Sequence, residues 1–142
     1  MSARPRIVVP ETPGDQHRAA VLNALIAHNE KAAGPSGFQQ VCLLVEDPET
    51  GATVGGLWGR ITYDWLFVEL LALPESARHG GLGTEILTRA ETIARERGCV
   101  GVWLDTYAFQ APGFYAKRGY EVFGTLADHP RGSHRLFYKK VL

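Results

Sequence analysis

A glycine-rich stretch between an apolar segment and an amphipathic one carries the clearest chemical signal in the sequence. Residues 71–98 are LALPESARHGGLGTEILTRAETIARERG, with glycine at positions 80, 81 and 83. Glycine destabilises a helix, so three glycines where a helix should begin indicate that bare backbone is needed there. A loop joining a strand to a helix N-terminus offers free N–H groups and the positive end of the helix dipole, and both bind anions. The sequence therefore predicts an anion site, with phosphate as the expected occupant.

The spacing of these residues rules out two widespread phosphate motifs. A Walker A loop needs a lysine followed by serine or threonine, and the dinucleotide fingerprint needs G-x-G-x-x-G. Neither pattern is present in the chain. The pattern that remains is R-x-x-G-x-G, formed by Arg78, Gly81 and Gly83. On its own this pattern is also compatible with a simple glycine-rich turn, so its structural context must decide.

Glu69 is the second candidate for chemistry, because it is the one charged residue in the apolar run WLFVELLALP. Two-residue alternation along a strand puts it on the same face as Trp65, Phe67, Leu71 and Leu73. A carboxylate on such a face is costly unless it is paired or opens into a cleft. Burial would raise the pKa of this carboxyl towards neutral, which suits a general base or a binding partner for an ammonium group. A structural salt bridge is the alternative.

The hydrophobic pattern predicts the elements that must position these residues, and it favours a mixed α/β sheet with helices on its faces. The expected order is β-α-β-β-β-α-β-α-β-β, within one domain of residues 1–142. A strand at 100–107 follows a helical crossover and should therefore run parallel to a strand at 65–73. The remaining expected elements are strands at 6–10, 40–47, 52–63, 120–126 and 134–142, and helices at 16–31, at 112–118 and between the glycine loop and Gly98.

Each of the two long helices is expected to have an apolar stripe and a solvated face. Asp15 is the expected cap of the first helix. In the second, the i,i+4 pairs Glu85–Arg89 and Glu91–Arg95 are expected on the solvent side. The stripe of the first helix comprises Val21, Leu22, Leu25 and Ile26. The stripe of the second comprises Leu82, Ile86, Leu87, Ala90, Ile93 and Ala94. A β-bulge or close backbone approach is expected at three strand glycines, Gly55, Gly56 and Gly59.

Composition argues against several classes of function. Lys+Arg and Asp+Glu both number 15, so the net charge is zero, which disfavours a nucleic-acid partner. No run approaches the ~20 apolar residues of a membrane span, and the N-terminus lacks the apolar core of a signal peptide, so we expect a cytoplasmic protein. The two cysteines, Cys42 and Cys99, are expected to be reduced. No pair of the five histidines has metal-ligand spacing, and no metal site is expected.

Two motifs at a fixed separation resemble the signatures of one protein family. The R-x-x-G-x-G pattern, after a strand ending in Pro-Glu and before an amphipathic helix, is similar to motif A of the GCN5-related N-acetyltransferases (GNAT). The segment AFQAPGFYAKRGYEVFG, residues 108–124, is similar to the next signature of that family. Its matching residues are Ala111, Tyr115, Gly119 and Tyr120. The expected element order also resembles the family over residues 6–142, so the resemblance implies a GNAT-like acyl-CoA N-acyltransferase fold.

The resemblance implies acetyl-CoA as cofactor, with its pyrophosphate on the glycine loop and Arg78 at the mouth of that loop. It also implies that the strand at 65–73 splays from the next parallel strand, and that the pantetheine arm lies along the exposed edge. Gln110 and Phe114 are expected to contact the cofactor too. The pyrophosphate-binding residues would be His79, Gly80, Gly81, Leu82, Gly83 and Thr84. The residues along the strand edge would be Leu71, Ala72 and Leu73.

The implied activity is N-acetyl transfer from acetyl-CoA to a primary amine of a small molecule, by direct attack in a ternary complex. Glu69 and Tyr115 are the candidate catalytic residues, with Tyr115 as the acid for the leaving thiolate or, alternatively, as a packing residue beside the cofactor. The asparagine common in the family seven residues before this tyrosine is Ala108 here. Its hydrogen bond to the pantetheine is therefore in doubt unless Gln110 or Thr106 replaces it.

The acceptor pocket is expected to be rich in aromatic side chains, which would suit a cationic or aromatic amine. The expected lining residues are Phe38, Trp58, Trp65, Asp105 and Tyr107, with Tyr63 and the loop 126–135 nearby. Two other functions stay open at this point: a non-catalytic acyl-CoA-binding regulatory domain, and an N-acetyltransferase for proteins or peptides. A homodimer is a further expectation from the family.

Overall fold

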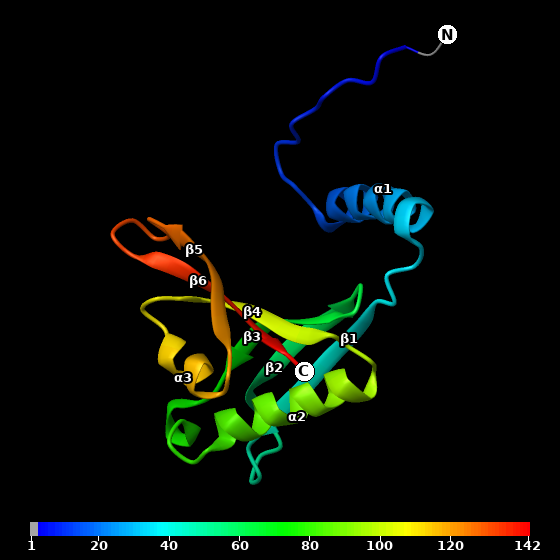
Figure 1. Ribbon diagram of the computed structural model, residues 1–142. Coiled ribbons are helices and arrows are strands. Elements are labelled where there is room, and N and C mark those ends of the chain that lie inside the picture. Colours follow the sequence, from blue (N-terminus) through cyan, green and yellow to red (C-terminus); the bar gives the residue numbers. More distant parts are fainter. Residues whose placement is uncertain (1–2) are drawn as a thin grey trace. The chain divides into compact units, whose positions relative to one another are not determined.

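The computed structural model describes residues 3–142 (Figure 1). These residues form two compact units, which meet in sequence between Ser36 and Gly37, and each unit is described by itself. No helix in the described part of the chain is both long and apolar enough to cross a membrane.

The first unit contains one helix, α1 (Asp15–Ala33). The strand expected at 6–10 is wrong: this segment has no regular structure, and Ile7 is 94% exposed. A strand needs a partner strand, and none of the described ladders includes this segment. The helix cap is Gly14, whose N–H donates to Nδ1 of His17 at 2.9 Å, so Asp15 is the first helical residue and not the cap. The stripe expected on α1 is present in sequence, but none of its residues is buried.

The second unit is a six-stranded mixed sheet with the order β1-β2-β3-β4-β6-β5. Its β3–β4 ladder is parallel, as the helical crossover predicted, and the other four ladders are antiparallel. The strands are β1 (Gln39–Glu46), β2 (Thr53–Thr62), β3 (Trp65–Ala72), β4 (Gly101–Tyr107), β5 (Glu121–Ala127) and β6 (His134–Val141). The helices are α2 (Leu82–Glu96) and α3 (Pro112–Lys117), with a 3-10 turn η1 (Glu75–Ala77) before α2. The predicted fold class is confirmed.

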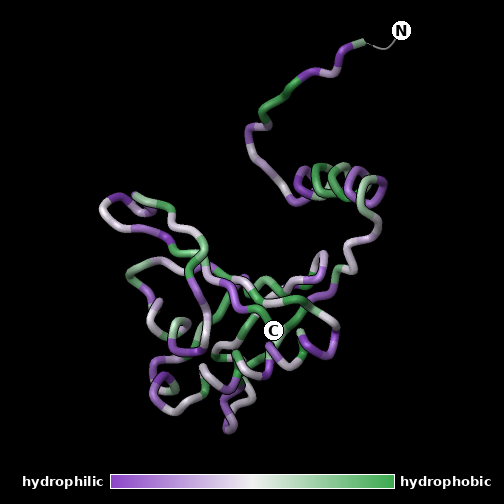
Figure 2. Tube along the Cα trace, viewed as in Figure 1, coloured by the Kyte–Doolittle hydropathy of each residue, from purple (hydrophilic) through white to green (hydrophobic). Residues whose placement is uncertain are grey.

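The core of this unit lies between α2 and one face of the sheet (Figure 1). The apolar stripe predicted for α2 is confirmed, because Ile86, Leu87, Ala90 and Ala94 are all buried in the core cluster. Figure 2 shows the hydrophobic residues concentrated along the central strands. The sheet contributes Val41, Leu57, Ile61, Leu66, Val68, Val102, Leu104 and Tyr138. Gly98 adopts φ +75° directly after α2, as expected of a glycine that ends a helix.

One surface pair predicted on α2 is confirmed and the other is wrong. Glu85 and Arg89 form an exposed i,i+4 pair at 3.8 Å. Glu91, expected on the solvent side with Arg95, is only 4% exposed. Its carboxylate instead pairs with Lys140 of β6. The reason is that two residues distant in sequence, Tyr120 and Lys140, direct their polar groups to this carboxylate.

A β-bulge interrupts the β2–β3 ladder, as the strand glycines predicted. Trp58 pairs with Leu70 and Gly59 pairs with Val68 in the ladder, which leaves the backbone of Glu69 without an opposite residue in β2. A bulge bends the strand and changes which face the following side chains occupy. Glu69 is the residue at which β3 changes its alternation.

Candidate active site

The parallel strands β3 and β4 separate at the centre of the sheet. Their pairing runs from Trp65 opposite Gly101 to Val68 opposite Leu104, and then stops. Residues 69–72 continue β3 without β4, while residues 105–107 of β4 stay paired with β6. The splay that the family resemblance implied is therefore confirmed by the register. The backbone edge of residues 69–72 has no partner in β4, so its N–H and C=O groups can pair with an amide-bearing ligand.

The glycine loop leads from this edge to the N-terminus of α2. Gly81 is the N-cap and has φ +77°, a conformation that glycine adopts without strain. No other atom lies within 4 Å of a Cβ added at Gly80 or Gly81, so the backbone there is open. A Cβ at Gly83 would lie 3.2 Å from Leu73 and 3.3 Å from Phe114. The third glycine therefore serves close packing within the chain, in addition to any ligand.

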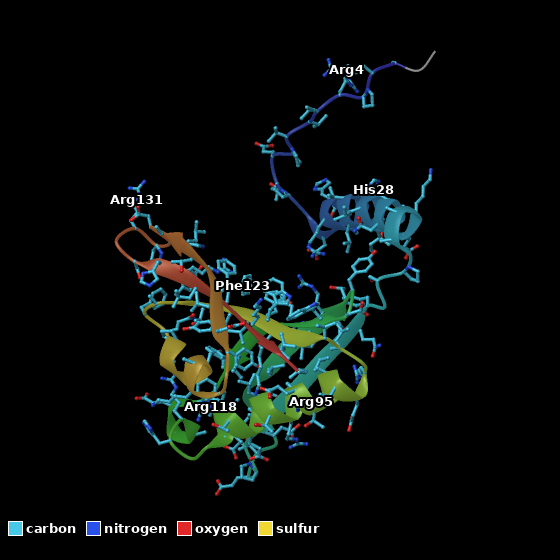
Figure 3. The ribbon with its side chains drawn as sticks, viewed as in Figure 1. Arg4, His28, Arg95, Arg118, Phe123 and Arg131 are labelled. Atoms are coloured by element: carbon cyan, nitrogen blue, oxygen red, sulfur yellow. The ribbon has the colours of Figure 1, made fainter. Side chains whose placement is uncertain are left out.

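Two arginines flank the loop, and the sequence singled out only one of them. Arg78 donates from Nε to the carbonyl of Leu73, at 3.4 Å, and so lies between the end of β3 and the loop. Arg118, the residue directly after α3, donates from Nε and Nη2 to Oγ1 of Thr84, at 2.9 and 2.6 Å. Figure 3 labels Arg118 beside the start of α2. No spacing pattern could have indicated this contact, because it joins two helices 34 residues apart.

Arg118 has unusual surroundings for a cation. It lies beside the positive end of the α2 dipole, which disfavours positive charge. Its hydrogen bonds in the described chain go to the Thr84 hydroxyl and the Phe114 carbonyl, and its guanidinium lies 4.4 Å from the centre of the Phe114 ring. These groups carry no full negative charge. The loop, the helix end and this guanidinium together form a site that a polyanion would stabilise.

Tyr115 lies on α3 among other aromatic rings. Its ring centre is 5.2 Å from Phe114, 6.1 Å from Tyr120 and 5.9 Å from Tyr138. Burial, with a smaller contribution from the negative charge of Asp105, raises the pKa of Tyr115 to about 12. Its hydroxyl therefore stays protonated at neutral pH and is available as a hydrogen-bond or proton donor.

Glu69 is placed differently from the sequence expectation. Its side chain is 44% exposed, so the predicted burial is wrong. It forms an ion pair at 3.4 Å with Arg60, whose guanidinium lies 4.9 Å from the centre of the Phe67 ring. Because the bulge at Glu69 resets the alternation, Leu71 packs against the core while Glu69 stays on the face of Arg60.

Asp105 and Tyr107 meet around one arginine on β6. Asp105, which was expected to line the acceptor pocket, lies within β4 and forms an ion pair with Arg135 at 2.6 Å. The guanidinium of Arg135 is also 5.6 Å from the centre of the Tyr107 ring. Tyr107 stacks on Phe109 with ring centres 5.1 Å apart. The two carboxylates of the site, Glu69 and Asp105, thus lie on the two strands that separate, and each is paired with an arginine.

Gln110 and Thr106 are the two candidates for the role of the absent asparagine. Oε1 of Gln110 accepts from the backbone N–H of Tyr107 at 2.8 Å and from the Thr106 hydroxyl at 2.9 Å. Oε1 of Gln110 and the Thr106 hydroxyl are therefore both engaged in hydrogen bonds within residues 106–110. The amide N–H₂ of Gln110 is the donor that this pair retains for a ligand.

The residues that were expected to line the acceptor pocket do not all line one pocket of the structure. Trp65 lines a pocket of about 450 Å³ that does not include Asp105 or Tyr107. The other lining residues of this pocket are Thr62, Tyr63, Trp103, Phe123, Phe137 and Lys139. Trp58, in the middle of β2, is 39% exposed, and Phe38, just before β1, is 57% exposed. Their part in acceptor binding stays a prediction.

Comparison with known proteins agrees with this geometry. The model of the acetyltransferase (GNAT) family matches residues 11–120, and the chain belongs to that family. It is therefore an acyltransferase that uses acetyl-CoA, as the two sequence motifs implied.

Three known proteins illustrate the relationship. Blasticidin-S acetyltransferase of Streptomyces morookaense is 45% identical over 91 residues, which are 62% of this chain and 67% of that protein. An acetyltransferase structure from Bacillus cereus is 33% identical with a TM-score of 0.82, covering 95% of this chain and 98% of that one. A protein from Bacillus anthracis, solved in complex with acetyl coenzyme A, is 17% identical with a TM-score of 0.63 and covers 80% and 67%; it shares the fold.

Proposed function

We propose that this enzyme acetylates a primary amine of a small molecule, by direct attack of the amine in a ternary complex. The observation that carries the proposal is the end of the β3–β4 ladder at Val68 and Leu104, which leaves the β3 edge leading to the glycine loop without a partner in β4. The 45% identity to a blasticidin-S acetyltransferase supports a small-molecule acceptor. The family match over 11–120 supports the view that the chain works as one acetyltransferase domain.

The chain offers groups for each part of acetyl-CoA, which supplies an activated acetyl thioester. The N–H groups of residues 79–84 and the guanidinium groups of Arg78 and Arg118 would hold the pyrophosphate. The free β3 edge at residues 71–73 would pair with the amides of the pantetheine arm. Phe114, packed against Gly83, would line the passage between them. The open backbone at Gly80 and Gly81 supports this fit.

The two candidate catalytic residues have separate tasks. Glu69, exposed and close to the strand opening, would bind the acceptor ammonium and take part in removing its proton. Asp105, on the opposite strand, adds negative charge on the acceptor side. Tyr115 would donate to the leaving thiolate, because its raised pKa keeps the hydroxyl protonated. This division places anions where the amine enters and a neutral donor where the thiolate leaves.

The test is thiol release from acetyl-CoA across a panel of small amines, including amine-bearing antibiotics and short peptides. We expect amine-dependent release, with Glu69→Gln and Tyr115→Phe each lowering kcat/KM by about 10²-fold. The matched control is Glu46→Gln, an exposed glutamate at the end of β1 that should behave as wild type. Acetyl-CoA binding without turnover would indicate a regulatory domain, and turnover of peptides alone would indicate a protein acetyltransferase.

A further inference from the structure

Glu91, Lys140 and Tyr120 form a buried polar network that the proposed mechanism does not use. Oε1 of Glu91 accepts from Nζ of Lys140 at 2.8 Å, and Oε2 accepts from the Tyr120 hydroxyl at 2.9 Å. Glu91 is 4% exposed. A buried ion pair is weak evidence for stability, because desolvation of the charges offsets their attraction. A fully satisfied network does, however, fix the orientation of the groups that it contacts.

The group that this network contacts is Tyr115. The rings of Tyr120 and Tyr115 meet edge to face, with an interplanar angle of 73°. The backbone N–H of Tyr120 also donates to the carbonyl of Tyr115 at 3.1 Å. Tyr120 is therefore held at both ends, by Glu91 at its hydroxyl and by Tyr115 at its backbone. Its ring forms a fixed wall beside the Tyr115 side chain.

Tyr115 needs such support because α3 cannot provide it. The helix has six residues, none of them buried, and a helix this short has little stability of its own. Its orientation must come from its contacts with the rest of the chain. The Arg118–Thr84 hydrogen bonds hold the C-terminal end of α3, and they leave the direction of the Tyr115 ring undetermined.

We propose that Glu91, acting through Tyr120, is a positioning residue that holds the Tyr115 hydroxyl toward the acetyl donor. The inference rests on the proposed role of Tyr115 as the acid. Lys140 donates to Oε1 of Glu91, which leaves Oε2 to accept from Tyr120 in one fixed geometry. The network links α2, whose N-terminus forms the anion site, to the residue that acts on the leaving group.

The test is a double-mutant cycle with Tyr120→Phe and Tyr115→Phe. Tyr120→Phe keeps the ring and removes only the hydroxyl, so the fold should persist. We expect kcat to fall about tenfold with KM for acetyl-CoA changed less than about twofold, since misplacing a catalytic group slows the chemical step. In the Tyr115→Phe background, Tyr120→Phe should then have no further effect on kcat, because the group that it positions is gone.

Glu91→Gln provides a second variant, with Glu85→Gln as its matched control on the exposed side of the same helix. We expect Glu91→Gln to lower kcat in the same way as Tyr120→Phe, and Glu85→Gln to leave it unchanged. An equal loss from Tyr120→Phe in both backgrounds would show a general structural role and overturn the inference. If Tyr115→Phe lowers kcat while Tyr120→Phe does not, positioning fails and the proposed function stands. An unchanged kcat in Tyr115→Phe would overturn the acid role itself.

Discussion

Tyr115 and Glu69 show how local surroundings suit two ionisable side chains to the opposite tasks proposed for them. Tyr115 lies among three aromatic rings, and burial raises its pKa to about 12. Glu69 lies on the open face of the sheet with Arg60 as its partner. A side chain that stays neutral suits proton donation, and an exposed anion suits capture of a cation from solvent. The role proposed for each side chain therefore follows from its exposure to solvent: Tyr115 is partly buried and Glu69 is exposed.

The raised pKa of Tyr115 predicts a loss of stability in alkali. The unfolded tyrosine ionises near pH 10, while the folded one stays neutral until about pH 12. The stabilisation by burial is therefore complete below pH 10 and is lost as the pH rises from 10 to 12. At pH 11 the ionisation of Tyr115 in the unfolded chain should lower the free energy of unfolding by about 1.4 kcal/mol. Urea unfolding of wild type and Tyr115→Phe at pH 9 and pH 11 checks this, and an equal decline in both would refute it.

At the scale of elements, the site is made by the ends of β3, β4 and α2. The strands separate after Val68 and Leu104, and α2 begins where the loop leaving β3 turns back toward the sheet. The glycine loop thus joins the free edge of β3 directly to the backbone N–H groups at the N-terminus of α2. In the proposed complex, these backbone groups would supply most of the contacts to the cofactor.

This arrangement predicts that two similar glycines differ in function. Gly81 at the start of α2 and Gly132 in the β5–β6 turn have φ +77° and +81°, and neither has an atom within 4 Å of an added Cβ. Alanine at either position should cost about 1 kcal/mol of stability from the strained backbone. Only Gly81→Ala should also weaken acetyl-CoA binding, by about tenfold in calorimetry, because its Cβ would project into the anion site. Equal binding by the two variants would place the cofactor elsewhere.

At the scale of the whole molecule, the described chain depends on the core between α2 and the sheet. Leu87 is fully buried in the middle of α2, together with Leu57, Leu66 and Leu104. The candidate site lies where β3 and β4 separate, beyond Val68 and Leu104. We therefore expect stability and function to depend on different parts of the same sheet.

Truncation of the core should lower stability without selectively impairing catalysis. Leu87→Ala removes a side chain with no exposed surface and should reduce the free energy of unfolding by about 2–5 kcal/mol. Leu44→Ala, at a position 59% exposed on β1, should cost much less. Chemical denaturation measures both. At a temperature where Leu87→Ala stays folded, its kcat should match wild type, and a selective loss of kcat would contradict the separation of core and site.

Sequence patterns alone predicted the sheet, the parallel pair, the amphipathic face of α2 and the glycine loop. These features are local or periodic, since two-residue and 3.6-residue alternation and glycine placement are written along the chain. The resemblance of two motifs to one family predicted the cofactor for the same reason, because each motif is contiguous.

The tertiary structure decided the environment of individual side chains. Glu91 was expected in solvent and is buried, because β6, almost 50 residues later, supplies Lys140 as its partner. Glu69 was expected to be buried and is exposed, because a bulge at that residue changes the faces of β3. Arg118 reaches Thr84 only once α3 packs beside α2. The burial and pairing of a side chain depend on contacts between segments that are distant in sequence. These contacts form only in the folded chain, so no local sequence pattern indicates them.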